Sequence, residues 1–276
     1  METSEDKYRG LRRLPPFPAV ATKLLRLLSE QDIHVRQVVE LIRADPALAS
    51  ELMRVVNSAL YGFPSRISSI QNAITLLGLD TVRSFALTVS MKGFLHTALR
   101  LDLLRRIWRH SLACGMLCEE LSAACSTSQG GDDRAYTAGL LHNVGRLGLF
   151  VAHPKAYSDL LTEPCETDLL ERERHVFGID HCEAGAWLAH SWGLPADLEA
   201  VIAGHHQPVH STDFDLADLV RVAVLLTDVM GFDVTPPSGC TLTEVRSMLP
   251  SAAQYRFDPD PEALTAKITD RLNTFD

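Results

Sequence analysis

The sequence lacks the usual marks of a secreted or membrane-bound protein. None of its six cysteines forms a CxxC pair, and the apolar runs, such as Val222 to Leu226, are far shorter than the roughly 20 residues of a membrane span. The first ten residues are polar and charged, unlike a signal peptide. Cysteines spread through hydrophobic, helix-like stretches are typical of reduced, structural thiols. We therefore expect a cytoplasmic protein with no membrane partner.

Basic residues are outnumbered by acidic ones. The chain has 26 Lys and Arg against 35 Asp and Glu, a net charge of −9. A broad nucleic-acid-binding surface needs clustered Lys and Arg to neutralise phosphates, so this balance disfavours a nucleic-acid partner. Small basic groups, such as Arg105, Arg106 and Arg109, are expected to be solvated helix faces.

The alternation of β-branched residues that marks β-strands is almost absent. Apolar residues instead recur at spacings of three and four in nearly every segment between turn signals, which is the pattern of amphipathic helices. With 276 residues, 46% of them hydrophobic, the chain is long enough for one large core or two small ones. We predict an all-α fold.

Several helix ends can be placed from capping residues. Asp45 followed by Pro46 predicts a helix start, and Gly62 with Pro64 predicts its end. The next helix is expected over 69–77, with Gly78 as its C-terminal cap. Further amphipathic helices are expected over 81–92, 101–125 and 258–275.

Polar groups interrupt two apolar helical segments. His142 and Asn143 are the polar centre of Ala138–Arg146, and burying two such side chains costs about 1–3 kcal/mol each unless something bonds them. Asp228 ends the apolar run Val222–Asp228 on a face that we expect to be buried. A carboxylate in that position requires a cation or hydrogen-bond donors.

Two adjacent histidines, His205 and His206, would point about 100° apart on a helix, so both can reach one site only near a helix end. Gly204 and Pro208 favour such an end. Spacing alone leaves two interpretations open: a shared metal or polar cluster, or unrelated core histidines. Imidazoles suit Zn, Fe, Mn or Ni.

Characteristic motifs occur in both halves of the chain. The first half contains Leu14–Pro18, Asp45–Leu48, Val56–Gly62 and Ile70–Gly78. The second half contains Trp108–Ser111, Gly139–Arg146, His181–Gly185, Trp192–Pro195 and His205–Pro208. Together these motifs resemble the HDOD domain, a relative of the HD and HD-GYP metal-dependent phosphohydrolases that lacks their catalytic pattern. The resemblance covers 14–228.

The resemblance implies an HD-like helical bundle with an N-terminal helical subdomain. It also implies a bacterial regulatory role in signalling, often in two-component, cyclic-dinucleotide or motility pathways. On this basis we divide the chain into a tail (1–13), the N-terminal helical half (14–92), the HD-like half (93–235) and a C-terminal helical extension (236–276), which we expect to dock on the body.

The resemblance also assigns metal ligands residue by residue. The similar enzymes would hold one metal with His110, His142, the position of Asn143, and Asp228. They would hold a second metal with His181, His205 and His206.

The chain departs from the enzymes at three places. Asn143 stands where they have a bridging Asp, Arg146 stands where HD-GYP enzymes have a catalytic Lys, and neither Glu nor Gly-Tyr-Pro follows His206. Two divalent ions would bring four positive charges, with Asp228 the only carboxylate left among the assigned ligands. We therefore expect at most one divalent transition metal, on His181, His205 and His206, in a vestigial or structural site lined by Asn143 and Arg146.

Three functions remain open at this point. The leading hypothesis is a non-enzymatic signalling pseudoenzyme that binds regulatory protein partners. The second is a weak one-metal phosphodiesterase or phosphohydrolase, because three imidazoles with an open position can activate water. The third is a nucleotide-binding regulatory module that uses Arg146 and the histidines as donors.

Overall fold

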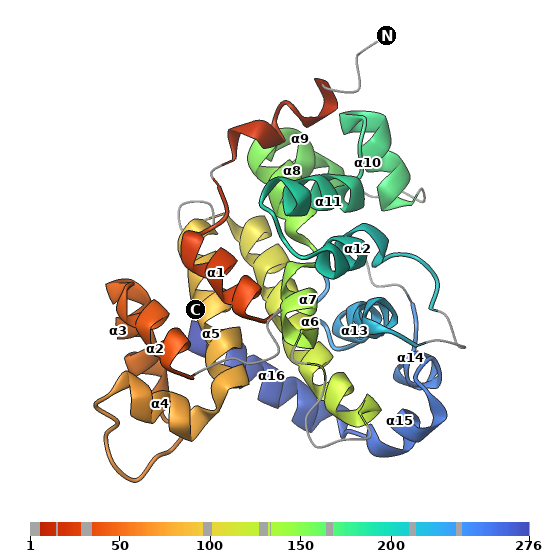
Figure 1. Cartoon of the computed structure of the whole chain (residues 1–276). Helices are drawn as coiled ribbons and strands as arrows, with labels where there is room; N and C mark the ends of the chain where they lie inside the picture. Colours follow the sequence, from red (N-terminus) through yellow and green to blue (C-terminus); the bar gives the residue numbers. More distant parts are fainter. Residues whose placement is uncertain are drawn as a thin grey trace. The chain divides into compact units, whose positions relative to one another are not determined.

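The structure, a computed structural model, describes residues 6–14, 16–28, 35–95, 101–126, 132, 134–163, 168–209, 214–235 and 239–275. Every regular element in these residues is a helix, which confirms the predicted all-α fold (Figure 1). The five cysteines that the structure describes are free thiols. Pro15, Cys165 and Pro236 lie outside the described residues.

The chain divides into two compact units. Unit 1 comprises Met1–Pro16 and Ala98–Asp258, and unit 2 comprises Phe17–Thr97 and Pro259–Asp276. This differs from the linear division made above, because the expected tail belongs to unit 1 and the expected extension is split between the units. The tail packs because Leu11 is buried and approaches Gly148.

The helices of unit 2 are α1 (Ala19–Leu28), α2 (Val35–Arg43), α3 (Pro46–Val56), α4 (Ile70–Leu77), α5 (Leu79–Leu95) and α16 (Pro261–Phe275). Those of unit 1 are η1 (Asp6–Tyr8), η2 (Leu11–Arg13), α6 (Asp102–Cys125), α7 (Ala135–Leu141), α8 (Val144–Ala152), α9 (Pro154–Thr162), α10 (Leu169–Phe177), α11 (His181–Ser191), α12 (Ala196–Gly204), α13 (Leu216–Val229), α14 (Leu242–Ser247) and α15 (Ser251–Arg256).

Capping residues set the ends of α3 and α4. The Asp45 side chain accepts hydrogen bonds from the backbone N–H groups of Ala47 and Leu48, as predicted for an N-cap. Gly78 caps α4 with φ +82°, also as predicted. However, α3 ends at Val56 and not at Gly62, because the Asn57 side chain donates to the carbonyls of Met53 and Ile67 and accepts from Ile67 N–H.

In unit 2, α16 places one apolar face inward. Leu264, Ile268, Leu272 and Phe275 are buried, as the sequence pattern predicted. The Phe275 ring packs against Phe85 at 5.8 Å between centroids, and Arg54 donates to the carbonyl of Thr274.

Unit 1 is built around the long helix α6, which is mostly buried and carries His110. Helices α7 and α13 lie alongside α6, and α8 also contacts it (Figure 1). Helix α11 packs against both α8 and α12. His142 follows the last residue of α7, His181 is the first residue of α11, and His205 follows the last residue of α12.

Two glycines allow α8, α11 and α12 to approach closely. A Cβ at Gly145 in α8 would overlap the carbonyl oxygen of His181 and lie 2.6 Å from the nitrogen of Gly185 in α11. A Cβ at Gly185 would lie 2.6 Å from the Cγ2 atom of Ile202 in α12. Because real Cβ atoms do not approach backbone so closely, these glycines fix the distance between the helices that carry the histidines.

No single helix in the described part of the chain combines the length and the hydropathy of a membrane span. Helix α4 and residues Leu79–Gly93 of α5 reach that threshold only as a pair, with a 116° bend between them.

We predict that Gly145→Ala lowers the free energy of unfolding by about 3 kcal/mol, because α8 and α11 must separate to admit one methyl group. Gly93→Ala is the control: a Cβ there meets nothing within 4 Å, so helix propensity should raise stability by about 0.5–1 kcal/mol. Urea unfolding followed by circular dichroism measures both values. Wild-type stability in Gly145→Ala would contradict the close contact.

Candidate metal centre

His181 lies at the first turn of α11, where the chain enters the helix through a capping box. The Asp180 side chain accepts from the N–H of Glu183, and the Glu183 side chain accepts from the N–H of Asp180. Arg174 forms an ion pair with Asp180. This cap fixes the start of α11 and therefore the position of the fully buried His181.

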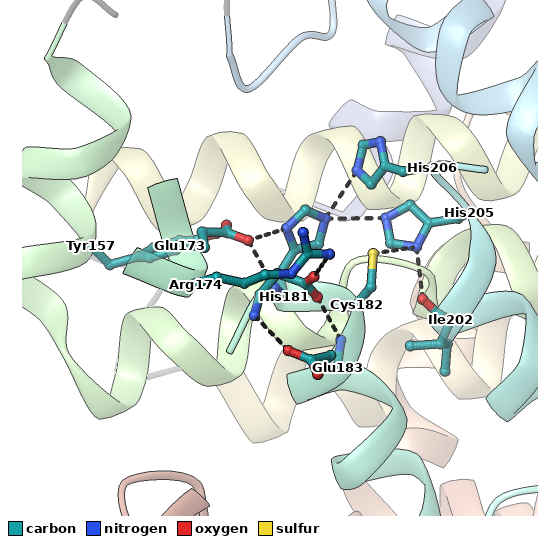
Figure 2. A network of polar contacts seen from close by, with 10 residues as sticks. Tyr157, Glu173, Arg174, His181, Cys182, Glu183, Ile202, His205 and His206 are labelled. Atoms are coloured by element: carbon teal, nitrogen blue, oxygen red, sulfur yellow. Dashed lines mark hydrogen bonds and ion pairs between the residues drawn. The ribbon is translucent and has the colours of Figure 1, made fainter. Parts of the chain in front are cut away.

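A buried carboxylate orients the His181 ring (Figure 2). Glu173 Oε2 accepts from both His181 Nδ1, at 2.6 Å, and the His181 backbone N–H, at 2.8 Å. The other oxygen, Oε1, accepts from the Tyr157 hydroxyl at 2.6 Å. Burial raises the pKa of Glu173, and the positive charge of Arg146 opposes that rise. Glu173 therefore holds the proton of His181 on Nδ1 and leaves Nε2 with a lone pair.

His205 and His206 follow the last residue of α12, so both side chains leave the helix end in a turn. His205 is buried, and its Nδ1 donates to the carbonyl of Ile202 at 2.8 Å. His206 is more exposed. As in His181, the proton of His205 is held on Nδ1, and Nε2 keeps its lone pair.

The three imidazoles converge through their Nε2 atoms (Figure 2). His181 Nε2 lies 3.0 Å from His206 Nε2 and 3.3 Å from His205 Nε2. The His181–His205 contact cannot be a hydrogen bond between neutral rings, because neither Nε2 has a proton to donate. Two lone pairs at this distance repel each other, and a cation bound by both nitrogens would remove that repulsion.

Protonation does not supply that cation at neutral pH. Burial, followed by the charge of Arg146, lowers the pKa of His181 well below its ordinary value. Burial, followed by His206, does the same for His205. Burial, with Arg146 and His142, lowers the pKa of His206 to about 4. All three rings are therefore neutral near pH 7, which is the state that binds metals.

The spacing of the Nε2 atoms fits metal coordination. Two nitrogens bound to one zinc ion at 2.0–2.1 Å in tetrahedral geometry lie about 3.3 Å apart. The observed separations are 3.0 and 3.3 Å. One ligand atom from each of His181, Cys182, His205 and His206 lies within 4.8 Å of the others, so these residues can hold a divalent transition metal.

The residues that the resemblance assigns to the first metal lie near one another, but their ligand atoms do not converge on one point. His110 Nδ1 donates to the carbonyl of Phe232 at 2.9 Å and lies 3.7 Å from Asp228 Oδ1. The centroid of the His142 ring lies 5.3 Å from the centroid of the His110 ring and 5.0 Å from that of the His205 ring. Among the described residues, only the group of three histidines and Cys182 brings its ligand atoms together.

Three buried polar atoms beside this group have no hydrogen-bond partner: His142 Nε2, Asn143 Oδ1 and Arg146 Nε. His142 is the residue at which α7 ends, and Asn143 precedes α8. His142 Nδ1 donates to the carbonyl of Gly139 at 2.6 Å, so its Nε2 also keeps a lone pair. An unsatisfied buried group costs about 1–3 kcal/mol, so these three atoms are suited to contact with a polar ligand, an ion or water.

The structure also identifies residues that the sequence did not point to. Glu173 and Tyr157 complete the hydrogen bonds behind His181. Glu173 lies in the charged run Glu171–Arg174, which resembles a solvated helix face, so no sequence signal marked it. The capping box of Asp180 and Glu183 could have been found from its spacing. Cys182, expected as a structural thiol, lies beside the imidazoles.

Comparisons with known proteins identify related chains. Residues 14–208 match the model of the HDOD domain. An uncharacterized protein from Treponema pallidum is 26% identical over 202 residues, which are 72% of this chain and 39% of that protein. The uncharacterized protein YuxH from Bacillus subtilis is 30% identical over 114 residues, 39% of this chain and 26% of YuxH. The chain thus spans less than half the length of these curated relatives.

Solved structures share the fold. A proposed signal-transduction protein from Marinobacter aquaeolei has a TM-score of 0.78 at 21% identity, over 98% of this chain and 65% of that one. A proposed phosphohydrolase from Shewanella amazonensis has a TM-score of 0.68 at 22% identity, and the match covers 98% of this chain and 95% of that one. An HDOD domain protein of unknown function from Geobacter sulfurreducens has a TM-score of 0.69 at 22% identity, and the match covers 98% of this chain and 96% of that one.

We predict that Glu173→Gln lowers the affinity for Zn²⁺ by about 10–100-fold, because the amide binds the Nδ1 proton of His181 less strongly and the ring loses basicity. The matched control is Glu171→Gln, an exposed position on the same helix. Competition with a chromophoric chelator measures both affinities. Equal affinities in the two variants would mean that Glu173 does not support the centre.

Proposed function

Because the chain belongs to the HDOD domain family, we propose that it is a non-enzymatic regulatory protein of bacterial signalling that acts by binding partner proteins. In this proposal the histidine centre holds one divalent metal that stabilises the fold. It does not catalyse a reaction.

The observation that supports this proposal most is the amide at position 143. A carboxylate there would offset charge and bridge two cations, whereas Asn143 is buried, neutral and has an Oδ1 without a hydrogen-bond partner. Asp228 does not compensate by itself, because it is one carboxylate against four positive charges, even though a pKa raised by burial to about 6 leaves it mostly ionised near pH 7. Two divalent ions would therefore be poorly neutralised.

A single metal on the three imidazoles has a clear structural use. His181 begins α11, and His205 and His206 follow α12, so one ion would cross-link the ends of two helices. It would also remove the repulsion between the facing lone pairs of His181 and His205. Binding free energy of this kind adds directly to the stability of the folded state.

The alternative is a weak one-metal phosphohydrolase. It is favoured by the convergence of three neutral imidazoles and by the description of the Shewanella amazonensis relative as a proposed phosphohydrolase. Three imidazoles with an open fourth position are a ligand set of catalytic zinc.

We predict that the wild-type protein, loaded with Zn²⁺ or Mn²⁺, does not hydrolyse cyclic dinucleotides, and that Asn143→Asp raises its metal occupancy from about one ion towards two, because a carboxylate supplies the missing charge. The control Asn143→Ala removes the amide without adding charge and should leave occupancy near one. Elemental mass spectrometry and a hydrolysis assay are the measurements. Saturable, metal-dependent hydrolysis by the wild type that His142→Ala abolishes would favour the enzyme.

A further inference from the structure

Cys182 lies next to the three histidines, yet its thiol has only a weak polar contact there. Its Sγ is 3.8 Å from His205 Nδ1. That nitrogen already donates its proton to the carbonyl of Ile202 at 2.8 Å, so it offers the sulfur little. The Cys182 side chain is buried, with 6% of the residue exposed (Figure 2).

The position of Cys182 on α11 places its sulfur on the same side as the imidazoles. Ligand atoms of Cys182 and of His181, His205 and His206 all lie within 4.8 Å of one another. Sulfur and nitrogen ligands of one tetrahedral zinc ion lie about 3.6 Å apart, and a bound ion would draw the thiol towards the Nε2 atoms. Cys182 is the second residue of α11, in its first turn, and a side-chain rotation can bring the sulfur closer.

We propose that Cys182 is the fourth ligand of the centre, which makes it a closed Cys-His₃ site for Zn²⁺. This inference rests on the single-metal centre of the proposed function and specifies its chemistry. A thiolate favours Zn²⁺ over harder ions such as Mg²⁺ or Mn²⁺. Four protein ligands leave no open position for a water nucleophile, so the site is structural and not catalytic.

Binding of the metal by Cys182 exchanges water ligands and one proton. The metal ion loses its water ligands, and the sulfur loses its proton to solvent as the sulfur–metal bond forms. No electron is transferred, and no further reactant is needed.

A pocket of about 590 Å³ connects this centre with the surface of unit 1. Cys182 and His206 line it, together with the carboxylates of Asp180, Glu183 and Glu199. Arg174 pairs with Asp180 and Lys7 with Glu183, which offsets part of this negative charge, and the pocket provides the entry path that a metal site needs.

Titration with Co²⁺ tests the proposal, because cobalt reports its ligands by absorption. We expect a sulfur-to-cobalt charge-transfer band in the near ultraviolet for the wild type and for the control Cys125→Ser, a half-buried thiol at the end of α6. Cys182→Ser should lose the band and bind Zn²⁺ at least tenfold more weakly. Far-ultraviolet circular dichroism of the metal-free proteins checks that each variant folds.

A second measurement needs no variant. In the wild-type protein, Zn²⁺ should protect Cys182 from alkylation, as read by peptide mass spectrometry, and a chelator should remove the protection. Cobalt binding by the wild type without a charge-transfer band would exclude Cys182 and leave the three-histidine centre standing. No cobalt binding at all would overturn both the centre and this inference.

Discussion

Two unprotonated nitrogens lie close together in the interior of unit 1, and the helix packing and hydrogen bonds of that unit hold them there. His181 Nε2 and His205 Nε2 lie 3.3 Å apart, each with its proton held on the opposite side of the ring, by Glu173 and by the carbonyl of Ile202. Without a cation this contact is repulsive. A divalent ion converts the same geometry into a favourable one, and this dependence links the metal to the packing of α11 and α12.

The rest of the unit can be understood as support for that contact. The capping box at the start of α11 fixes the position of His181. Helix α12 ends at Gly204, so the adjacent residues His205 and His206 lie in a turn and both can reach the same site. Gly145 and Gly185 permit α8, α11 and α12 to pack with almost no space between them. Burial then keeps the rings neutral by lowering the pKa of each. Helix packing, desolvation and ligand geometry therefore act together on the same few atoms.

The sequence predicted the helices well because their periodicity and caps are local signals. Asp45 and Gly78 cap helices where expected, and the apolar face of α16 is buried. The early end of α3 was not predictable, because Asn57 pairs with the backbone of Ile67, ten residues away. Glu173 was missed for the same kind of reason: a charged residue among charged neighbours becomes a buried partner of His181 only through tertiary packing. Each unit combines two separate stretches of the chain, and this division likewise depends on tertiary contacts.

We infer one metal ion per chain, held by imidazoles that Glu173 helps to orient, with the amide of Asn143 disfavouring a second ion. The most direct test is the metal content of tag-free protein purified without chelator, measured by elemental mass spectrometry. We expect about one transition-metal ion per chain. About two ions per chain would show that Asn143 does not prevent a second ion from binding, and a value near zero after incubation with excess Zn²⁺ would show that the three histidines do not bind a metal.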